Sequence, residues 1–402
     1  MKAKGSVLGA ASNRRSFLKN GMVTAGAATV GAALLPSGLR AFDDDNDRAP
    51  ITKGDIAILR FLNALEQVEA DLWQQYSELG GTQDNEVAGA KGGGNPLYTA
   101  ALEILDGDMA QYIHDNTDDE NSHAAFLGNY LESKGAEPVD LGKFRVLPSS
   151  KAAGAQDIGR LTNLTQLTID TSFWSVYRSI TNPDFDPPKF VQAVPTLNVG
   201  MHTAIPRFVA DTDGSSLSSD NTKSITPHLQ AIAFTAGFHF AFIEQGGTSL
   251  YPALAQKVTN LEVLRILLSI GPSETMHFQT WQDKAGNALP LTVVDNVPGG
   301  TGASVTFNDL TQGQGETDPE SLNGDTLQSN LIMPEPTHFL HENLGPVAII
   351  RPTSTKNGGA VAAVQSFFKD GLFRGHKPLN NPAFVQFLMG LAEEADEARR
   401  QI

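Results

Sequence analysis

Four segments of the chain repeat apolar residues at the spacing of an α-helix. The first shows the pattern clearly, with Ile58, Leu62, Leu65 and Leu72 separated by four, three and seven positions. Such intervals place the side chains on one face of a helix. We therefore predict an all-α fold class with long helices in residues 55–79, 96–134, 227–257 and 261–285.

Capping and helix-breaking residues indicate where the first two helices begin and end. Asp55 can cap the first helix, and Gly80 can stop it. Asn95-Pro96 is typical of a helix start, because proline is favoured at the first helical position. The helical pattern then continues to Lys134 with a break near Gly107.

The last two helices have clear start signals and one internal obstacle. Pro227 opens the third helix, and Thr259-Asn260-Leu261-Glu262 has the form of a capping box for the fourth. Pro272 interrupts the fourth pattern, where a proline removes one backbone hydrogen bond and costs roughly 3 kcal/mol. Either the fourth helix kinks at Pro272, or another helix starts there.

Two of these helical segments carry the motif Glu-x-x-His. The motifs are Glu120-Asn-Ser-His123 and Glu274-Thr-Met-His277. Residues three apart on a helix share one face, so the carboxylate and the imidazole can reach the same point. One copy is a weak signal, because Glu and His are common surface residues, but two copies on separate long helices are a stronger one.

Each motif is preceded by a helix in which a Glu is followed seven residues later by an aromatic residue. The pairs are Glu66 with Trp73 and Glu244 with Tyr251. A carboxylate in an apolar stripe is costly to bury unless it is paired or bound to metal. The chain thus reads Glu, Glu-x-x-His, Glu, Glu-x-x-His, the ligand set of a carboxylate-bridged dinuclear metal site in a four-helix bundle. The predicted ligands are Glu66, Glu120, His123, Glu244, Glu274 and His277, whereas Glu69 is interpreted as part of a solvated edge.

This order and spacing resemble the ferritin-like superfamily, in particular its desiccation-related and bacterial ferritin-like domain proteins. The resemblance covers roughly residues 55–135 and 227–285. It implies an antiparallel four-helix bundle with a long crossover, holding two iron or manganese ions. One Glu from each half would bridge the metals, and each His would bind terminally. The resemblance also implies oxidation of ferrous iron, removal of peroxide or oxidation of an organic substrate.

The amino-acid composition excludes several other kinds of site. The 402 residues include no Cys, which excludes disulfides, zinc thiolate sites and thiol nucleophiles, so any metal must be held by His and carboxylates. The net charge of −16 argues against a nucleic-acid binder or a polybasic membrane-surface protein. Affinity order alone would favour copper or zinc at such a site, so iron or manganese requires that metal availability during folding decides.

The N-terminus predicts export. Arg14-Arg15 match the twin-arginine pattern and precede a mildly apolar run, Gly21–Leu35, that is too short to span a bilayer comfortably. Residues 1–41 are therefore expected to be an export signal for the twin-arginine translocation machinery, followed by an acidic linker at 42–54. The mature chain is expected to be periplasmic or secreted, without a transmembrane helix. Twin-arginine export carries folded proteins, which suits a buried metal site.

The remaining segments are interpreted as an insertion and an extension. Residues 55–288 would form the bundle, with the insertion at 136–226, and residues 289–402 would form an irregular, loop-rich extension. The extension is expected to shield the bundle or to make a contact in a homo-oligomer. The predicted elements of these segments are a helix at Thr162–Ile180, a hairpin within Leu289–Asn330, a strand at Val347–Ile350 and helices at Ala360–Leu372 and Asn381–Arg400.

Other histidines do not meet the same test. A third Glu-x-x-His, at Glu335 and His338, contains Pro336 and has no partner Glu at a comparable distance, so it is interpreted as a chance match. His341, three residues after His338, could bind metal only if this segment were helical. His114 lies nine residues before His123, off the shared helix face, and is interpreted as a surface or supporting residue.

Two functions of different class follow from the sequence. The leading hypothesis is an exported protein with a di-iron or di-manganese site that acts as an oxidoreductase. The alternative is a non-catalytic stress- or desiccation-related protein that keeps the bundle for its stability. Metal content separates them, because a structural protein need not bind stoichiometric metal. Storage of iron in a cage is disfavoured, because the crossover and the extension are large for shell packing.

Overall fold

The structure is a computed structural model that describes most of the chain after the N-terminal segment. The predicted export signal and residues 42–49 of the acidic linker lie outside the described residues, and the last two linker residues, Lys53 and Gly54, already belong to the first long helix. All described residues belong to one compact unit, residues 49–402. They are mostly helical, with few and short strands. The described residues are 50–87, 89–175, 192–218, 223–310, 334–335, 337, 341, 343–349, 358–376 and 384–401.

Four long helices agree with the four predicted segments. The short helix α3 (Pro96–Leu102) ends well before the next long helix begins, so the predicted break near Gly107 is confirmed. The long helices are α2 (Lys53–Gly80), α4 (Met109–Ser133), α6 (Pro227–Ala255) and α7 (Leu261–Ala285).

Capping side chains explain where these helices start. The Thr52 side chain caps α2, and Asp55 reaches back to the Thr52 backbone N–H, so Asp55 completes a capping box and is not the cap itself. In α7 the cap is Asn260, whose side chain accepts from the N–H groups two and three residues on. The predicted capping box headed by Thr259 is therefore wrong by one residue.

Helix α7 passes through Pro272 without ending, so a new helix start at this proline is excluded. The carbonyl that loses its backbone partner belongs to Leu268, which is 57% exposed and therefore lies where water can reach it. Gly271 allows the close approach of α6 at this point. A Cβ on Gly271 would lie 2.8 Å from the Cβ of Tyr251.

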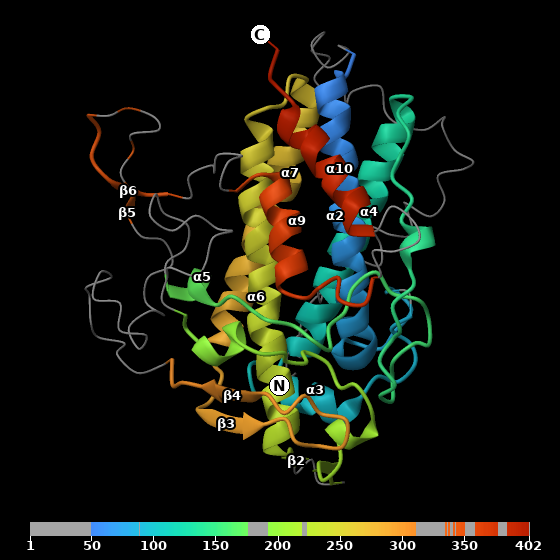
Figure 1. Ribbon diagram of the computed structural model, residues 1–402, viewed down its shortest axis with the longest axis vertical. Helices are drawn as coiled ribbons and strands as arrows, with labels where there is room; N and C mark the ends of the chain where they lie inside the picture. The colour runs from blue at the N-terminus through green and yellow to red at the C-terminus, as the bar shows by residue number, and fades with distance from the viewer. Residues whose placement is uncertain are drawn as a thin grey trace, which may run out of the picture. The chain divides into compact units, whose positions relative to one another are not determined.

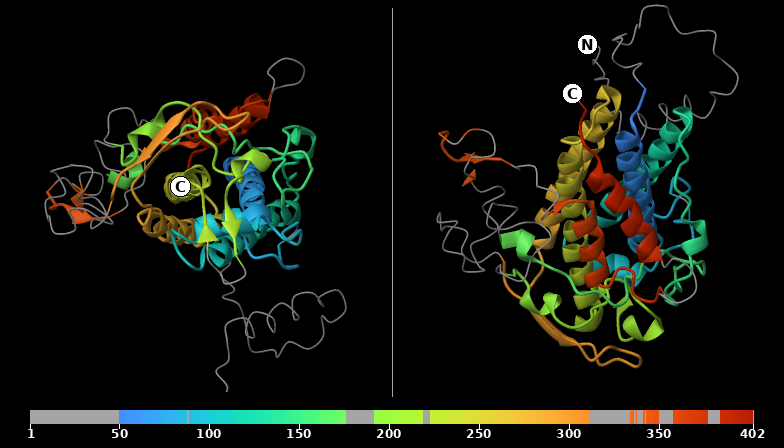
Figure 2. Two further views of the ribbon diagram at one scale, coloured as in Figure 1. Left: turned by 90° about the horizontal axis from the view of Figure 1, so that it is seen from below. Right: turned by 45° about the horizontal axis from the view of Figure 1, so that its top comes forward.

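The long helices pack as two pairs, α2 with α4 and α6 with α7. Only residues 256–260 connect α6 and α7, so these neighbours run antiparallel. The two pairs lie side by side, with their axes close to the vertical of Figure 1. Seen from below, α9 (Ala360–Lys369) and α10 (Phe384–Glu397) lie across one face of them (Figure 2), where α9 contacts α6 and α10 contacts α2. This covering explains why the apolar α6 is buried on nearly all sides.

The insertion between the helix pairs is largely irregular, and the helix predicted at Thr162–Ile180 is wrong for residues 162–171. Asp71 of α2 accepts hydrogen bonds from the backbone N–H groups of residues 161 and 162, and Leu167 exchanges backbone hydrogen bonds with His202. Tertiary partners thus take the groups that a helix would use. Residues 176–180 lie outside the described part. The described elements of the insertion are η2 (Gly142–Phe144), α5 (Ser172–Ser175), η4 (Pro195–Asn198), η5 (Val209–Asp211), β1 (Ser216–Leu217) and β2 (Lys223–Ser224).

The C-terminal part contains the predicted hairpin and two covering helices. Strand β3 (Leu291–Val294) pairs antiparallel with β4 (Ser304–Phe307), which confirms the hairpin for the described residues of this segment. Strand β5 (Pro334–Glu335) pairs with β6 (Val347–Ala348), so the third Glu-x-x-His begins in a strand, and its His338 lies outside the described residues. The last two helices are α9 and α10, each shorter than predicted. Among the described helices, none has both the length and the apolar character needed to cross a membrane.

Candidate metal centre

The six predicted ligands lie together in the interior of the helical unit. Their four carboxylates are at most 2% exposed. The possible ligand atoms form two groups, each with all atoms within 4.8 Å of one another, and Glu120 and Glu274 belong to both groups. Glu66 comes from α2, Glu120 and His123 from α4, Glu244 from α6, and Glu274 and His277 from α7.

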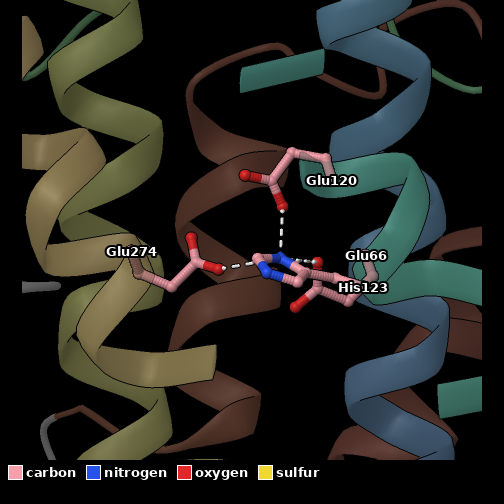
Figure 3. A group of neighbouring side chains, drawn as sticks. All are labelled: Glu66, Glu120, His123 and Glu274. Carbon is pink, nitrogen blue, oxygen red and sulfur yellow. Dashed lines mark hydrogen bonds and ion pairs between the residues drawn. The ribbon is translucent and has the colours of Figure 1, made fainter. Parts of the chain in front are cut away.

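The first group surrounds the Nδ1 atom of His123. The distances from this nitrogen are 3.5 Å to Glu66 Oε2, 3.1 Å to Glu120 Oε2 and 3.3 Å to Glu274 Oε1. Figure 3 shows the three carboxylates directed at one imidazole from three helices. A cation among these atoms would meet oxygen and imidazole donors, which suit iron and manganese.

The second group surrounds the Nδ1 atom of His277. This nitrogen lies 3.1 Å from Glu120 Oε1 and 3.2 Å from Glu244 Oε2. Glu120 therefore directs one carboxylate oxygen to each imidazole, Oε1 to His277 and Oε2 to His123. A carboxylate in this orientation is suited to bridge two cations.

Each of the two unshared carboxylates is held by an aromatic side chain from the other half of the chain. Trp73 Nε1 donates to Glu244 Oε1 at 2.9 Å, and the Tyr251 hydroxyl donates to Glu66 Oε1. The aromatic residue seven positions after each Glu thus contacts the Glu of the opposite half, which explains why the spacing recurs. In both carboxylates the oxygen left over, Oε2, is the one that faces an imidazole.

The second nitrogen of each imidazole is also contacted from the opposite half. His277 Nε2 lies 3.0 Å from Asp119 Oδ2, and His123 Nε2 lies 3.3 Å from Ser273 Oγ. Asp119 and Ser273 each directly precede the Glu of a Glu-x-x-His motif. Such contacts orient a metal-binding imidazole, and a carboxylate partner also raises its basicity. The two imidazoles therefore have equivalent positions but partners of different strength.

The end of the cluster around Glu244 is closed by hydrogen-bond donors. Asn116 Nδ2 donates to Glu244 Oε1 at 3.0 Å and to Glu120 Oε1 at 2.9 Å. The Asn116 side chain is held in turn by Trp281, whose Nε1 donates to Asn116 Oδ1 at 2.6 Å. The rings of Trp281 and Trp73 stack, with 5.2 Å between centroids. Packed side chains therefore fill this end of the centre.

The opposite end, around Glu66 and Glu274, has fewer donors. Glu66 Oε2 and both carboxylate oxygens of Glu274 are buried, and apart from the His123 imidazole no described residue offers them a hydrogen-bond donor. A buried carboxylate oxygen without a donor is costly. A bound dication would provide the missing partner, so the orphaned oxygens fit a metal site.

Without a cation, protons must balance the charge of the cluster. Burial, reinforced by neighbouring carboxylates, raises the pKa of Glu120 to about 7 and the pKa of Glu274 to about 8. Burial by itself lowers the pKa of His123 and of His277, but the carboxylates beside each imidazole outweigh it and raise both pKa values. All four shifts favour bound protons, which divalent cations would displace.

The buried carboxylates and imidazoles of these six residues could therefore form a metal site. We compared the chain with known proteins. No family model, curated protein or solved structure matches it. The ferritin-like resemblance therefore stays a prediction from the motifs, and the site rests on its own geometry.

Sequence reasoning missed Asn116 and misjudged Glu69. Asn116 lies four residues before Glu120, so their shared helix face was an available signal. Glu69 is not in a solvated edge: the residue as a whole is half-buried, but its Oε1 is shielded and accepts no hydrogen bond. Burial and the nearby carboxylates, Glu120 foremost, raise the pKa of Glu69 well above its usual range. Its position between Glu66 and Trp73 on one helix face was the signal that could have found it.

Two other groups of acidic and histidine side chains lie away from this centre. The first group consists of Asp84, Glu86 and His114. His114 is only 2% exposed, with Nε2 2.9 Å from Asp84 Oδ1, so it does not lie on the surface. The Asp115 and Asp84 carboxylates raise the pKa of His114 to about 9. Of the two interpretations given to His114, the surface residue is therefore excluded, whereas a supporting role agrees with its contact to Asp84 in the loop that follows α2.

The other group consists of Asp211, His228 and Asp295. Arg207 already pairs with both carboxylates, at 2.7 Å from Asp211 Oδ1 and 2.8 Å from Asp295 Oδ2. Burial opposes ionisation of Asp211, but hydrogen bonds from Arg207 and His228 hold its pKa down at about 2. The guanidinium thus already pairs with both carboxylates of this group, which ties the insertion to the β3–β4 hairpin.

Proposed function

We propose that this chain is an exported ferritin-like protein whose carboxylate-bridged dinuclear iron or manganese site reacts with dioxygen or peroxide. The observation that carries the proposal is Glu120, which directs one oxygen to each of two imidazoles. Glu274 also belongs to both groups, so each half of the chain contributes one shared carboxylate. In Figure 1, α2 and α7 run downward while α4 and α6 run upward, which supports an antiparallel bundle with residues 136–226 as its crossover.

Each side chain has a distinct part in this proposal. Glu66 and Glu244 would each hold one ion through Oε2, because a donor from the opposite half occupies Oε1. The shared carboxylates would bridge, and each Nδ1 would bind one ion. Two such ions supply the electron pair that reduces peroxide or begins the reduction of dioxygen. Two dications would also balance the charge of the four carboxylates.

Metal content and metal-dependent stability test the proposal. Protein matured with its own export signal should contain iron or manganese at up to two ions per chain, one for each group. Adding ferrous or manganous ion to the metal-free protein should raise its melting temperature, because a ligand that binds only the folded state stabilises it. Glu120→Ala and Glu274→Ala should each lose at least one ion. Glu335→Ala should bind metal like the wild type.

Reaction of the loaded protein tests the second part of the proposal. Dioxygen or peroxide should oxidise bound ferrous ion faster than it oxidises free ferrous ion under the same conditions. A wild-type protein that holds no metal, shows no thermal shift with either ion and tolerates Glu274→Ala would overturn the proposal. That outcome would favour a non-catalytic stress- or desiccation-related protein that keeps the helical scaffold for its stability.

A further inference from the structure

A pocket lies between α2, α6 and α9, beside the Glu66 end of the metal centre. We call it the glycine pocket, because Gly246 and Gly247 form part of its α6 wall. Its cavity volume is about 30 Å³, which is room for one small molecule. Its walls are leucine, valine, isoleucine, alanine and phenylalanine side chains, apart from the glycines, Glu66, Glu69 and Tyr251.

The inner end of the glycine pocket reaches one candidate ligand, Glu66, and its wall residue Gly247 lies against a second, Glu274. Glu66 lines the pocket and also faces His123 through Oε2. A Cβ on Gly247 would lie 2.8 Å from Glu274 Oε2, so the absence of a side chain there lets this carboxylate pack closely against α6. Glu66 Oε2 and both Glu274 oxygens are the buried carboxylate oxygens that, among the described residues, face no donor other than His123. A molecule in the pocket would therefore approach the His123 side of the centre.

The two ends of the centre differ in what occupies the space next to the carboxylates. Asn116 and Trp281 fill the space at Glu244 with hydrogen-bonded side chains. At the Glu66 end, α6 contributes Gly246 and Gly247, and the wall carries apolar groups. A small molecule thus has room on one side of the centre, where the oxygens have fewer donors.

The lining of the pocket selects for a neutral molecule. Apolar walls disfavour an ion or a strongly hydrated molecule, and the neighbouring carboxylates repel anions. The passage under α9 is narrow, because a Cβ on Gly246 would already lie 3.6 Å from the Phe367 ring. We propose that the glycine pocket binds a small apolar molecule of the size of dioxygen, next to Glu66. The proposed function enters only in naming dioxygen as the natural occupant.

Xenon tests the binding site without any metal, because this apolar atom occupies dry apolar cavities. Metal-free crystals of the full mature chain under xenon pressure should show xenon in the glycine pocket. Gly246→Leu should fill the pocket and lower xenon occupancy by about tenfold, the effect of roughly 1.4 kcal/mol. Gly390→Leu is the matched control, since Gly390 lies in α10 and its Cβ would meet nothing within 4 Å. Gly246→Ala, with its methyl at ordinary contact distance from Phe367, should lower occupancy less and serves if the leucine variant does not fold.

The rate of reaction with dioxygen tests whether dioxygen is the natural occupant of the glycine pocket. With ferrous ion bound, Gly246→Leu should react with dioxygen about tenfold more slowly than Gly390→Leu, at equal metal content. Wild-type crystals without xenon in the pocket would overturn the proposal, whatever metal the protein holds. An unchanged dioxygen rate in a variant that has lost xenon, or a loss confined to the peroxide reaction, would overturn dioxygen as the occupant. A wild-type protein that takes xenon but no metal would support the pocket and refute the proposed function.

Discussion

Replacing Gly247 with alanine should separate the stability of helix α6 from the binding of metal. Gly247 lies inside the helix, where alanine is more favourable than glycine by about 1 kcal/mol. The added Cβ would lie 2.8 Å from Oε2 and 2.9 Å from Cγ of Glu274, closer than ordinary contact. The Glu274 carboxylate must therefore move by about half an ångström, the tolerance within which a metal ligand has to be placed.

The two effects of this substitution fall on different states of the protein. A glutamate side chain can rotate away from the new methyl, so the metal-free variant should be as stable as the wild type or up to about 1 kcal/mol more stable. Because Glu274 belongs to both ligand groups, its displacement affects both cations. We expect the affinity for Mn²⁺ to fall by about tenfold or more, which corresponds to at least about 1.4 kcal/mol.

Gly246→Ala is the matched control for Gly247→Ala. It brings the same gain in helix propensity, but its Cβ would meet only Phe367, at 3.6 Å. Thermal unfolding with and without Mn²⁺, together with anaerobic metal titration, measures both quantities. Gly246→Ala should keep the full thermal shift on adding Mn²⁺, and Gly247→Ala should lose most of it. Equal Mn²⁺ affinity in the two variants would refute the argument that Gly247 makes room for the shared carboxylate.

The site and the N-terminus give four further predictions. Because burial raises the pKa of Glu120 to about 7 and of Glu274 to about 8, metal must displace protons, so Mn²⁺ affinity in chelator competition should rise with pH and level off above about pH 8. Because these two carboxyls ionise at a lower pH in the unfolded chain than in the folded protein, the metal-free protein should lose stability from about pH 5 to pH 8. A melting temperature that stays constant over this pH range would contradict the raised pKa values. Asp119→Asn should weaken the metal at the imidazole it contacts by about tenfold or more, and Ser273→Ala should have the smaller effect on the other metal in the same titration. Lysine in place of both twin arginines should keep the protein in the cytoplasm in a fractionation experiment, and normal export would contradict the signal.

The long helices could be predicted because each buries one apolar face, and the residues of that face recur at helical spacing in the sequence. The segment Thr162–Ile180 shows where this reasoning ends. Its apolar residues also recur at helical intervals, but the Asp71 carboxylate and the backbone of His202 take its N–H and C=O groups. Partners so distant in sequence leave no local pattern, so the irregular backbone at 162–171 was not predictable.

The six candidate ligands were also predictable in position, because helical spacing forces a Glu and a His three residues apart onto one face. The contacts that these six side chains make with the rest of the protein could not be predicted. Trp73 and Glu244 are 171 positions apart, and only packing of the two helix pairs brings them together. Glu69 was misjudged for a related reason: its helix face was visible in the sequence, but the helix that covers it was not.

The contacts between the two halves follow the rule of a twofold-symmetric dimer, although a single chain makes them. In such an isologous interface, residue i of one copy meets residue j of the other, and j meets i. Two identical copies would need the same residue at equivalent positions. Within a single polypeptide, equivalent positions can carry different residues. Asp119 contacts one imidazole and Ser273 contacts the other. Likewise, Glu69 lies three residues after Glu66, whereas Gly247 lies three residues after Glu244. The covalent connection therefore lets the two ends of the cluster differ, which identical subunits could not encode: the Glu244 end is held by hydrogen-bond donors, and the Glu66 end borders the pocket.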